Sequence, residues 1–236
     1  MIKKIYDFLY LKYGPQGWFP LIELHNNTGV NPTKSGSING YHPGNYSYPK
    51  NKVQQWEIIL GCVLTQNVSW VNVERALLNL KELKAINPVQ LLELDENMLK
   101  EAIKPAGYFN QKYKTLREFA IFFLALTQKP NRKELLDLWG IGPETADCIL
   151  LYAFQVPTFV VDTYTKRIFN NLKLISEKET YDEIKSLFED NLKPNIIIYQ
   201  EYHALLVEHA KRYYAKKGNY QNCPLYKKFG KIKEND

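Results

Sequence analysis

Residues 138–147 read LWGIGPETAD, a glycine turn between two apolar stretches with helical patterning. Gly140 and Gly142 permit backbone dihedral angles that other residues resist, and Pro143 suits the first position of a following helix. Free backbone N–H groups at such a turn, before a helix N-terminus, form an anion site, and a DNA phosphate is a natural ligand for it. The alternative is an ordinary helical hairpin, because many of these have glycine turns.

The period of the apolar residues is helical along nearly the whole chain. In residues 54–64, QQWEIILGCVL, the side chains of Trp56, Ile59, Leu60 and Val63 fall on one helical face. No alternating runs bounded by Asn-Gly or Asp-Gly indicate a sheet. We therefore predict an all-α fold.

The length and composition predict a folded, intracellular protein. A chain of 236 residues, 45% of them hydrophobic, is long enough to bury a core. No apolar run approaches the roughly 18 residues of a membrane span, and residues 1–16 lack the small-residue cleavage site of a signal peptide. The cysteines are odd in number and widely spaced, which argues against a disulfide framework and for a reducing compartment; they are Cys62, Cys148 and Cys223.

The net charge of +6 is unevenly distributed. Residues 211–233 hold eight lysines or arginines and no acid, interleaved with aromatic residues, and a second acid-free stretch separates Glu23 from Glu57. A basic strip with aromatics is a footprint for a polyanion, most often nucleic acid, so Lys216 and Lys217 are candidate DNA contacts. The alternative is a solvated tail that only keeps the protein in solution.

One segment departs from the helical pattern. Residues 26–52 are rich in glycine, proline and asparagine, which predicts a loop. A loop of this length is either a lid over a site or a disordered insertion. Tyr41, Tyr46 and Tyr48 favour an ordered loop that makes contacts.

Three segments resemble those of a known family. In residues 154–172, FQVPTFVVDTYTKRIFNNL, Asp162 follows an apolar run and directly precedes an amphipathic helix. Together, residues 138–172 resemble the helix-hairpin-helix and Gly/Pro-Asp segment of the endonuclease III superfamily of DNA glycosylases. Residues 60–70, LGCVLTQNVSW, resemble that family's helix end before a glutamine, and residues 105–116, PAGYFNQKYKTL, resemble its G-x-Y-N-x-K-A segment.

This resemblance implies a two-domain helix-hairpin-helix DNA glycosylase fold. Residues 52–156 are then a six-helix barrel that carries the hairpin, and residues 1–51 with 157–236 form a second helical domain from both chain ends. The family binds double-stranded DNA and holds a flipped, damaged base in the cleft between its domains. The DNA-binding residues carried over from the family are Gln66, Asn67, Gly140, Ile141, Gly142 and Thr145. Of these, Gln66 matches the residue that the family inserts into the gap left by the extruded base.

Two acidic residues occupy the family's catalytic positions. Asp162 matches the essential carboxylate, which stabilises an oxocarbenium-like sugar and helps to activate water. Bifunctional members carry a lysine where this chain has Glu144, and a carboxylate cannot form an imine with the sugar. The resemblance therefore implies a monofunctional glycosylase without strand cleavage. The alternatives are a helix N-cap for Asp162, a favourable N-terminal charge for Glu144 and a helix-capping amide for Gln66.

The C-terminal region departs from the family, in which many members bind a [4Fe–4S] cluster through cysteines spaced C-x6-C-x2-C-x5-C. If Cys223 is the third of these, the other positions hold Tyr213, Tyr220 and Phe229. One thiolate cannot bind such a cluster, so we expect no iron–sulfur cofactor. The resemblance also implies that the hairpin turn can bind a monovalent cation through its backbone carbonyls, as relatives do.

The loss of both the lysine and the cluster resembles the 3-methyladenine DNA glycosylase branch. That branch has a similar Trp-aromatic-Pro near its N-terminus, here Trp18, Phe19 and Pro20, which sandwiches the flipped base. An N-alkylated purine is cationic and stacks well on aromatic rings. His203 is a further pocket candidate, although Leu205 stands where the branch can have a lysine. Ordinary core packing is the alternative for the aromatic pair.

Two other functions remain open from the sequence. One is a glycosylase of the same fold for uracil, mismatched thymine or another damaged pyrimidine, and the other is a non-enzymatic helix-hairpin-helix DNA-binding protein. We expect a monomer without a membrane partner, located in a prokaryotic cytoplasm with the nucleoid.

Overall fold

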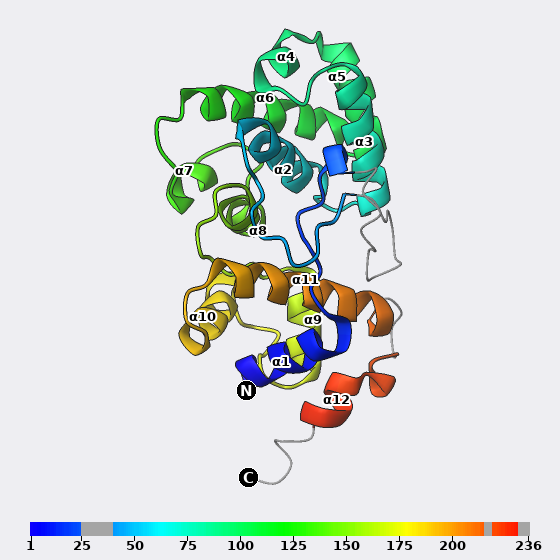
Figure 1. The fold of residues 1–236 in the computed structure, drawn as a ribbon, viewed down its shortest axis with the longest axis vertical. Coiled ribbons are helices and arrows are strands. Elements are labelled where there is room, and N and C mark those ends of the chain that lie inside the picture. The colour runs from blue at the N-terminus through cyan, green and yellow to red at the C-terminus, as the bar shows by residue number, and fades with distance from the viewer. Residues whose placement is uncertain (25–39, 215–218, 231–236) are drawn as a thin grey trace. The chain divides into compact units, whose positions relative to one another are not determined.

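The computed structural model describes residues 1–24, 40–214 and 219–230, and every regular element within these ranges is a helix (Figure 1). The all-α prediction is thus confirmed. Contacts divide the chain into two compact units. We call Gly17–Val156 the central unit, and Met1–Gln16 with Pro157–Asp236 the terminal unit. None of the described helices combines the length and the apolar character needed to cross a membrane.

The central unit is built around α2 (Lys52–Leu64), which contacts α3, α6 and α8. Oδ1 of Asn51 accepts the amide hydrogen of Gln54 at 2.9 Å and so starts this helix. The nine residues from Trp56 to Leu64 are nearly all fully buried, as expected for a helix surrounded by others. The other α-helices of the unit are α3 (Trp70–Glu82), α4 (Pro88–Glu93), α5 (Glu96–Ile103), α6 (Phe109–Ala125), α7 (Arg132–Leu136) and α8 (Pro143–Cys148).

Short helical turns complete this unit. The 3-10 turns η1 (Ile22–Leu24) and η2 (Lys104–Ala106) precede α2 and α6. The π-helical turn η3 (Ile149–Ala153) continues α8 and packs against α2. α8 therefore runs on into the core rather than ending at the surface.

In the structure, the N-terminal segment from Gly17 onward belongs to the central unit. We expected residues 1–51 to belong with the second domain, but the division falls after Gln16. The amide of Ile22 donates to Oε1 of Glu57 on α2, and the amide of Leu21 donates to the Gly40 carbonyl at 3.0 Å. Burial raises the pKa of the Glu57 carboxyl to about 7. The first of these hydrogen bonds attaches the segment to α2 and the second to Gly40, and periodicity can reveal neither partner.

Part of the predicted loop makes the expected contacts. Tyr41 is 5% exposed, and the ring of Tyr48 lies 4.6 Å from that of His42. Residues 25–39, which hold most of the predicted loop, lie outside the described residues.

The terminal unit packs its helices around α11 (Ile196–Tyr213), which contacts α1 (Ile2–Tyr13) and α9 (Thr163–Asn171). The hydroxyl of Tyr202 donates to the carbonyl of Ile2 at 2.9 Å, so the first helix is held by one from near the other end of the chain. Phe159 stacks on Phe188 at 3.9 Å between ring centroids. α10 (Tyr181–Asn191), η4 (Asn219–Asn222) and α12 (Pro224–Phe229) complete the unit.

Candidate functional site

A helical hairpin forms at the predicted glycine turn, between α7 and α8 of the central unit. Gly140 has φ +79°, and a Cβ there would lie 2.3 Å from Oγ1 of Thr115 on α6. The position therefore excludes a side chain both by its dihedral angle and by its space. Nε of Arg132 on α7 donates to Oδ1 of the buried Asp147 on α8 at 2.9 Å, which holds the two hairpin helices together.

The hairpin residues differ in exposure. Gly140, Gly142 and Glu144 are exposed, whereas Ile141 and Thr145 are buried. Glu144 lies in the first turn of α8, where a negative charge is favourable. The exposed side chain at position 144 is thus a carboxylate and not an amine.

The turn after α2 is bonded to the hairpin through Gln66. Its Nε2 donates to the carbonyl of Gly140 at 3.1 Å and to Oγ1 of Thr145 at 2.9 Å. Asn67 beside it is exposed, with a left-handed φ of +57°. The resemblance assigned Gln66, Gly140 and Thr145 to DNA binding. The structure brings them together, although Gln66 is 74 or more positions from the other two in the chain.

Two carbonyls of the hairpin turn, the candidate ligands of a monovalent cation, accept hydrogen bonds within the protein. The carbonyl of Leu138 accepts the amide hydrogen of Ile141 at 3.2 Å, and that of Gly140 accepts from Gln66. Each carbonyl oxygen has a second lone pair, so these hydrogen bonds leave room for a cation, and a monovalent cation at the hairpin stays a prediction.

In the terminal unit, Asp162 and His203 lie together. Oδ1 of Asp162 accepts the Thr165 amide hydrogen at 2.6 Å and caps α9, while Oδ2 lies 3.7 Å from Nε2 of His203 on α11. Burial raises the pKa of Asp162, but the contacts with His203 and Thr165 outweigh it, and the net pKa is below the ordinary value. The side chain is therefore an ionised carboxylate that is only 8% exposed.

The aromatic segment belongs to the central unit and is largely buried. The ring of Phe19 lies 5.1 Å from that of Trp70 and 5.5 Å from that of Tyr152. Gly61 of α2 makes room for it, since a Cβ there would lie 2.6 Å from the Phe19 ring. Phe19 thus packs as a core residue. Pro20 is also buried, whereas Trp18 is only half-buried and keeps accessible surface.

His42 is a site residue that the sequence analysis missed. Its Nε2 lies 2.9 Å from the carbonyl of Phe19, and its Nδ1 lies 2.7 Å from that of Asn45. Burial lowers the pKa of this imidazole. His42 thereby fixes the backbone of the aromatic segment. Nothing in the local sequence identifies it, because the contact joins residues 23 positions apart.

Lys112 of α6 is a second such residue, and it lies in the segment that resembles G-x-Y-N-x-K-A. Its Nζ donates to the carbonyls of Leu64, Gln66 and Ala106 at 2.7, 3.0 and 2.8 Å. The motif could have identified Lys112 from the sequence. Its partners lie at the end of α2, in the turn after it and in η2, and only the fold shows that they are near Lys112.

The C-terminal basic strip is described only in part, since Lys216 and Lys217 lie outside the described residues. Lys227 and Lys228 of α12 are exposed. The buried Sγ of Cys223 lies 2.9 Å from Nε2 of His209, whose Nδ1 lies 2.8 Å from the Tyr13 hydroxyl.

The donor set around Cys223 does not fit an iron–sulfur cluster. Tyr213, Tyr220 and Phe229 supply no thiolate at the family's other positions. Over the described ranges, no three His, Cys, Asp or Glu side chains come close enough together to hold a metal ion. An iron–sulfur cluster is therefore not part of the mechanism that we propose.

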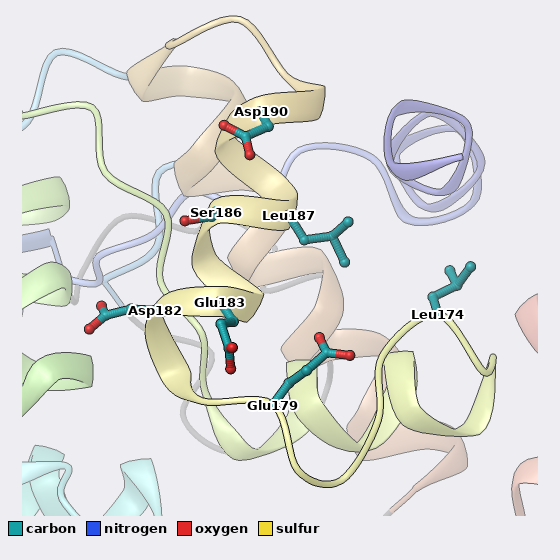
Figure 2. A pocket seen from close by; sticks show the side chains of 7 residues that line it. All are labelled: Leu174, Glu179, Asp182, Glu183, Ser186, Leu187 and Asp190. Carbon is teal, nitrogen blue, oxygen red and sulfur yellow. The ribbon is translucent and has the colours of Figure 1, made fainter.

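A surface depression of about 610 Å³ lies on the terminal unit (Figure 2). It is lined by four acidic side chains together with Leu174, Ser186 and Leu187; the acidic residues are Glu179, Asp182, Glu183 and Asp190. A concentration of carboxylates repels phosphate. This depression is therefore unsuited to DNA.

Comparisons with known proteins identify the family of this chain. The family model for the HhH-GPD superfamily base excision DNA repair protein matches residues 60–194. A putative DNA repair glycosylase, MJ1434 of Methanocaldococcus jannaschii, is 42% identical over 237 residues, which cover 95% of this chain and 94% of that protein. Endonuclease III of Sulfolobus acidocaldarius is 28% identical over 65% of this chain and 71% of that protein.

Solved structures have the same fold. The H. pylori 3-methyladenine DNA glycosylase (MagIII) bound to 1,N6-ethenoadenine is 26% identical with a TM-score of 0.64, over 89% of this chain and 95% of that one. A trapped endonuclease III–DNA covalent intermediate has a TM-score of 0.70 at 17% identity, over 96% of this chain and 94% of that one, and shows the fold alone. The chain therefore belongs to the HhH-GPD superfamily of base excision DNA repair proteins, as a DNA glycosylase.

Proposed function

We propose that this glycosylase is monofunctional and hydrolyses the N-glycosidic bond of a damaged base flipped out of double-stranded DNA. Its substrate class is the N-alkylated purines, such as 3-methyladenine. The observation that carries this proposal is the geometry of Asp162, a buried carboxylate with one oxygen held by the Thr165 amide and the other beside His203. Breaking the bond leaves positive charge on the sugar, and a fixed anion in a poorly solvated site stabilises that charge.

The two oxygens of Asp162 have different tasks in this mechanism. Oδ1 is held by the Thr165 amide, which fixes the carboxylate at the start of α9. Oδ2 is the oxygen for the sugar cation and for the attacking water, whose proton the carboxylate can accept. His203 lies beside Oδ2 and orients it. The base departs with the bonding electrons, and water then attacks the sugar, leaving an abasic site.

Glu144 supports hydrolysis without strand cleavage. A lyase step begins when an amine attacks the sugar carbon and forms an imine, which a carboxylate cannot do. The side chain at this hairpin position is exposed and acidic. The product DNA should therefore keep an intact backbone at the abasic site.

The aromatic segment supports an alkylated purine as the substrate. Such a base carries positive charge, and the accessible surface of Trp18 offers it a π-face. The similarity to the H. pylori 3-methyladenine glycosylase points the same way. A neutral pyrimidine would gain little from this surface, which is why we favour the purine over uracil or mismatched thymine.

Binding of the duplex is assigned to the hairpin turn, the Gln66–Asn67 turn and the basic strip, including Lys216 and Lys217. Backbone N–H groups at the glycine turn suit a phosphate, and lysines add charge that depends on salt. We propose that one copy of the chain engages the DNA.

Release of bases from defined duplexes tests this function. Duplexes with 3-methyladenine, uracil opposite guanine or thymine opposite guanine are incubated with the protein, and free bases are separated by chromatography. We expect release of the methylated purine and at least tenfold less of either pyrimidine. Faster release of a pyrimidine would reassign the substrate, and no release from any duplex would leave a DNA-binding protein without this activity.

A further inference from the structure

The side chain of Lys112 is 3% exposed, and its three hydrogen-bond acceptors are all backbone carbonyls. An ammonium group has three N–H donors, so this set satisfies it completely. The three carbonyls do not neutralise the charge of the ammonium group, because none of them belongs to a carboxylate. Burial accordingly lowers the pKa of Lys112 to about 8. A buried cation in this position costs folding stability compared with an apolar side chain of similar length.

The three carbonyls lie at places where the backbone needs an external partner. Leu64 is the last residue of α2, Gln66 follows it, and Ala106 ends η2. Carbonyls at a helix C-terminus have no partner within the helix, and the helix dipole makes this end negative. The ammonium therefore fixes the path of the chain as it leaves α2 and ties it to the start of α6.

Gln66 connects Lys112 to the hairpin. Its carbonyl is held by Lys112, while its side chain bonds Gly140 and Thr145. Thr115, three positions after Lys112 on α6, fills the space beside Gly140. One face of α6 thus supports both the Gln66 turn and the hairpin turn.

We propose that Lys112 is a positioning residue for base extrusion, whose charge holds Gln66 where its side chain can enter the gap left in DNA. The inference rests on the proposed function, since it assigns Lys112 a part in that function. It predicts a selective defect. Binding to undamaged duplex through the hairpin should persist, but preference for a duplex with a gap should be lost.

The test compares Lys112→Met, Gln66→Ala and the double variant, with Lys100→Met as a matched control. Lys100 is a lysine of the same unit that pairs with Glu96 at the surface. Affinity is measured for an undamaged duplex and for one with a tetrahydrofuran abasic analogue. A 2-aminopurine opposite the analogue reports insertion by its fluorescence. Neither readout needs base release.

We expect Lys112→Met and Gln66→Ala each to reduce the preference for the analogue at least tenfold. The double variant should lose no more than Gln66→Ala alone, because a residue that acts through another adds nothing once that other is removed. Lys100→Met should match the wild type. The proposal is overturned if Lys112→Met lowers only thermal stability, or if its effect adds fully to that of Gln66→Ala.

Should Lys112→Met fail to fold, the charge is removed from the wild-type chain by raising the pH from about 7 to about 9.5, across the pKa of about 8. Other titratable groups on the packed elements are bonded elsewhere: Glu57 of α2, with a pKa of about 7, accepts the Ile22 amide hydrogen, Lys104 of η2 bonds Glu101, and Tyr113 of α6 faces Lys100. Preference for the analogue should fall in the wild type and stay flat in Gln66→Ala. Equal behaviour of the two would refute the inference. Absence of glycosylase activity would overturn only the proposed function.

Discussion

Oδ2 of Asp162 lies 3.7 Å from Nε2 of His203, while Oδ1 of the same carboxylate accepts the Thr165 amide hydrogen at 2.6 Å. The two oxygens thus face different helices, α11 and α9. A helix cap and a reactive carboxylate were competing interpretations of this residue from the sequence. In the structure, the helix cap uses only Oδ1, so both interpretations are compatible and Oδ2 can take part in a reaction.

Asp162→Asn should abolish base release while leaving DNA affinity within about a few-fold. The amide oxygen can still accept from Thr165, so α9 keeps its cap, but the negative charge that stabilises the sugar cation is gone. Single-turnover release and duplex binding measure the two effects separately. Wild-type turnover in this variant would contradict the catalytic assignment.

His203→Gln should move the acid limb of the pH–rate profile to higher pH. The contact with His203 helps to keep the pKa of Asp162 below its ordinary value, so the wild type retains the ionised form as the pH falls. Without that contact, Asp162 takes up a proton earlier, near the ordinary aspartate pKa of about 3.9 or above it. Rates between about pH 4 and pH 7 reveal the shift. An unchanged limb would show that His203 does not influence the carboxylate.

DNA affinity should fall steeply with salt, and neutralising the basic strip should flatten that dependence. Lys227 and Lys228 are exposed on α12, and each phosphate contact contributes about 0.9 to the slope of log K against log salt. Lys227→Gln/Lys228→Gln should therefore reduce the slope by about one to two. Lys185→Gln is the control, because that lysine pairs with Glu189 on α10. Half as large a change in the control, which removes one charge rather than two, would assign the effect to net charge alone.

The purified protein should be colourless and free of iron. Cys223 alone cannot replace four thiolates, and its sulfur already contacts His209. Elemental analysis and the visible absorbance spectrum provide the check. A brown protein with about four irons per chain would refute this prediction.

Wild-type protein should give no covalent complex with DNA under borohydride, and its product should break only on heating in alkali. The reason is the carboxylate at Glu144. Glu144→Lys should gain weak, borohydride-trappable cleavage, because the positive end of the helix dipole at the start of α8 lowers the pKa of the new amine. The wild type is the decisive sample. A trapped adduct there would mean that another lysine performs lyase chemistry.

Local patterns in the sequence predicted a large part of this structure. Apolar residues at helical spacing identified α2, and the pair Gly140 and Gly142 identified the hairpin. Motif resemblance selected Asp162. Each of these depends on neighbours within a few positions in the chain, which is the range over which periodicity and turn chemistry carry information.

Contacts between distant segments could not be predicted in the same way. Residues 17–24 pair with α2 through Glu57, and Gln66 reaches residues 74 and 79 positions away. A helical period reports which face of a helix is apolar, but not which partner covers it. Phe19 illustrates the limit: its aromatic motif suggested a base clamp, whereas its ring packs against Trp70 in the core.

The pairing of α1 with α11 has a consequence for synthesis of the chain. Tyr202 and Ile2 are 200 positions apart, so a ribosome adding roughly 5–20 residues per second takes about 10–40 seconds between them. During that interval the central unit can emerge and fold, while the apolar side of α1, with Ile5 and Leu9, has no α11 to cover it. α1 is thus synthesised well before the helix that covers it, and its apolar side is buried only after α11 has been made.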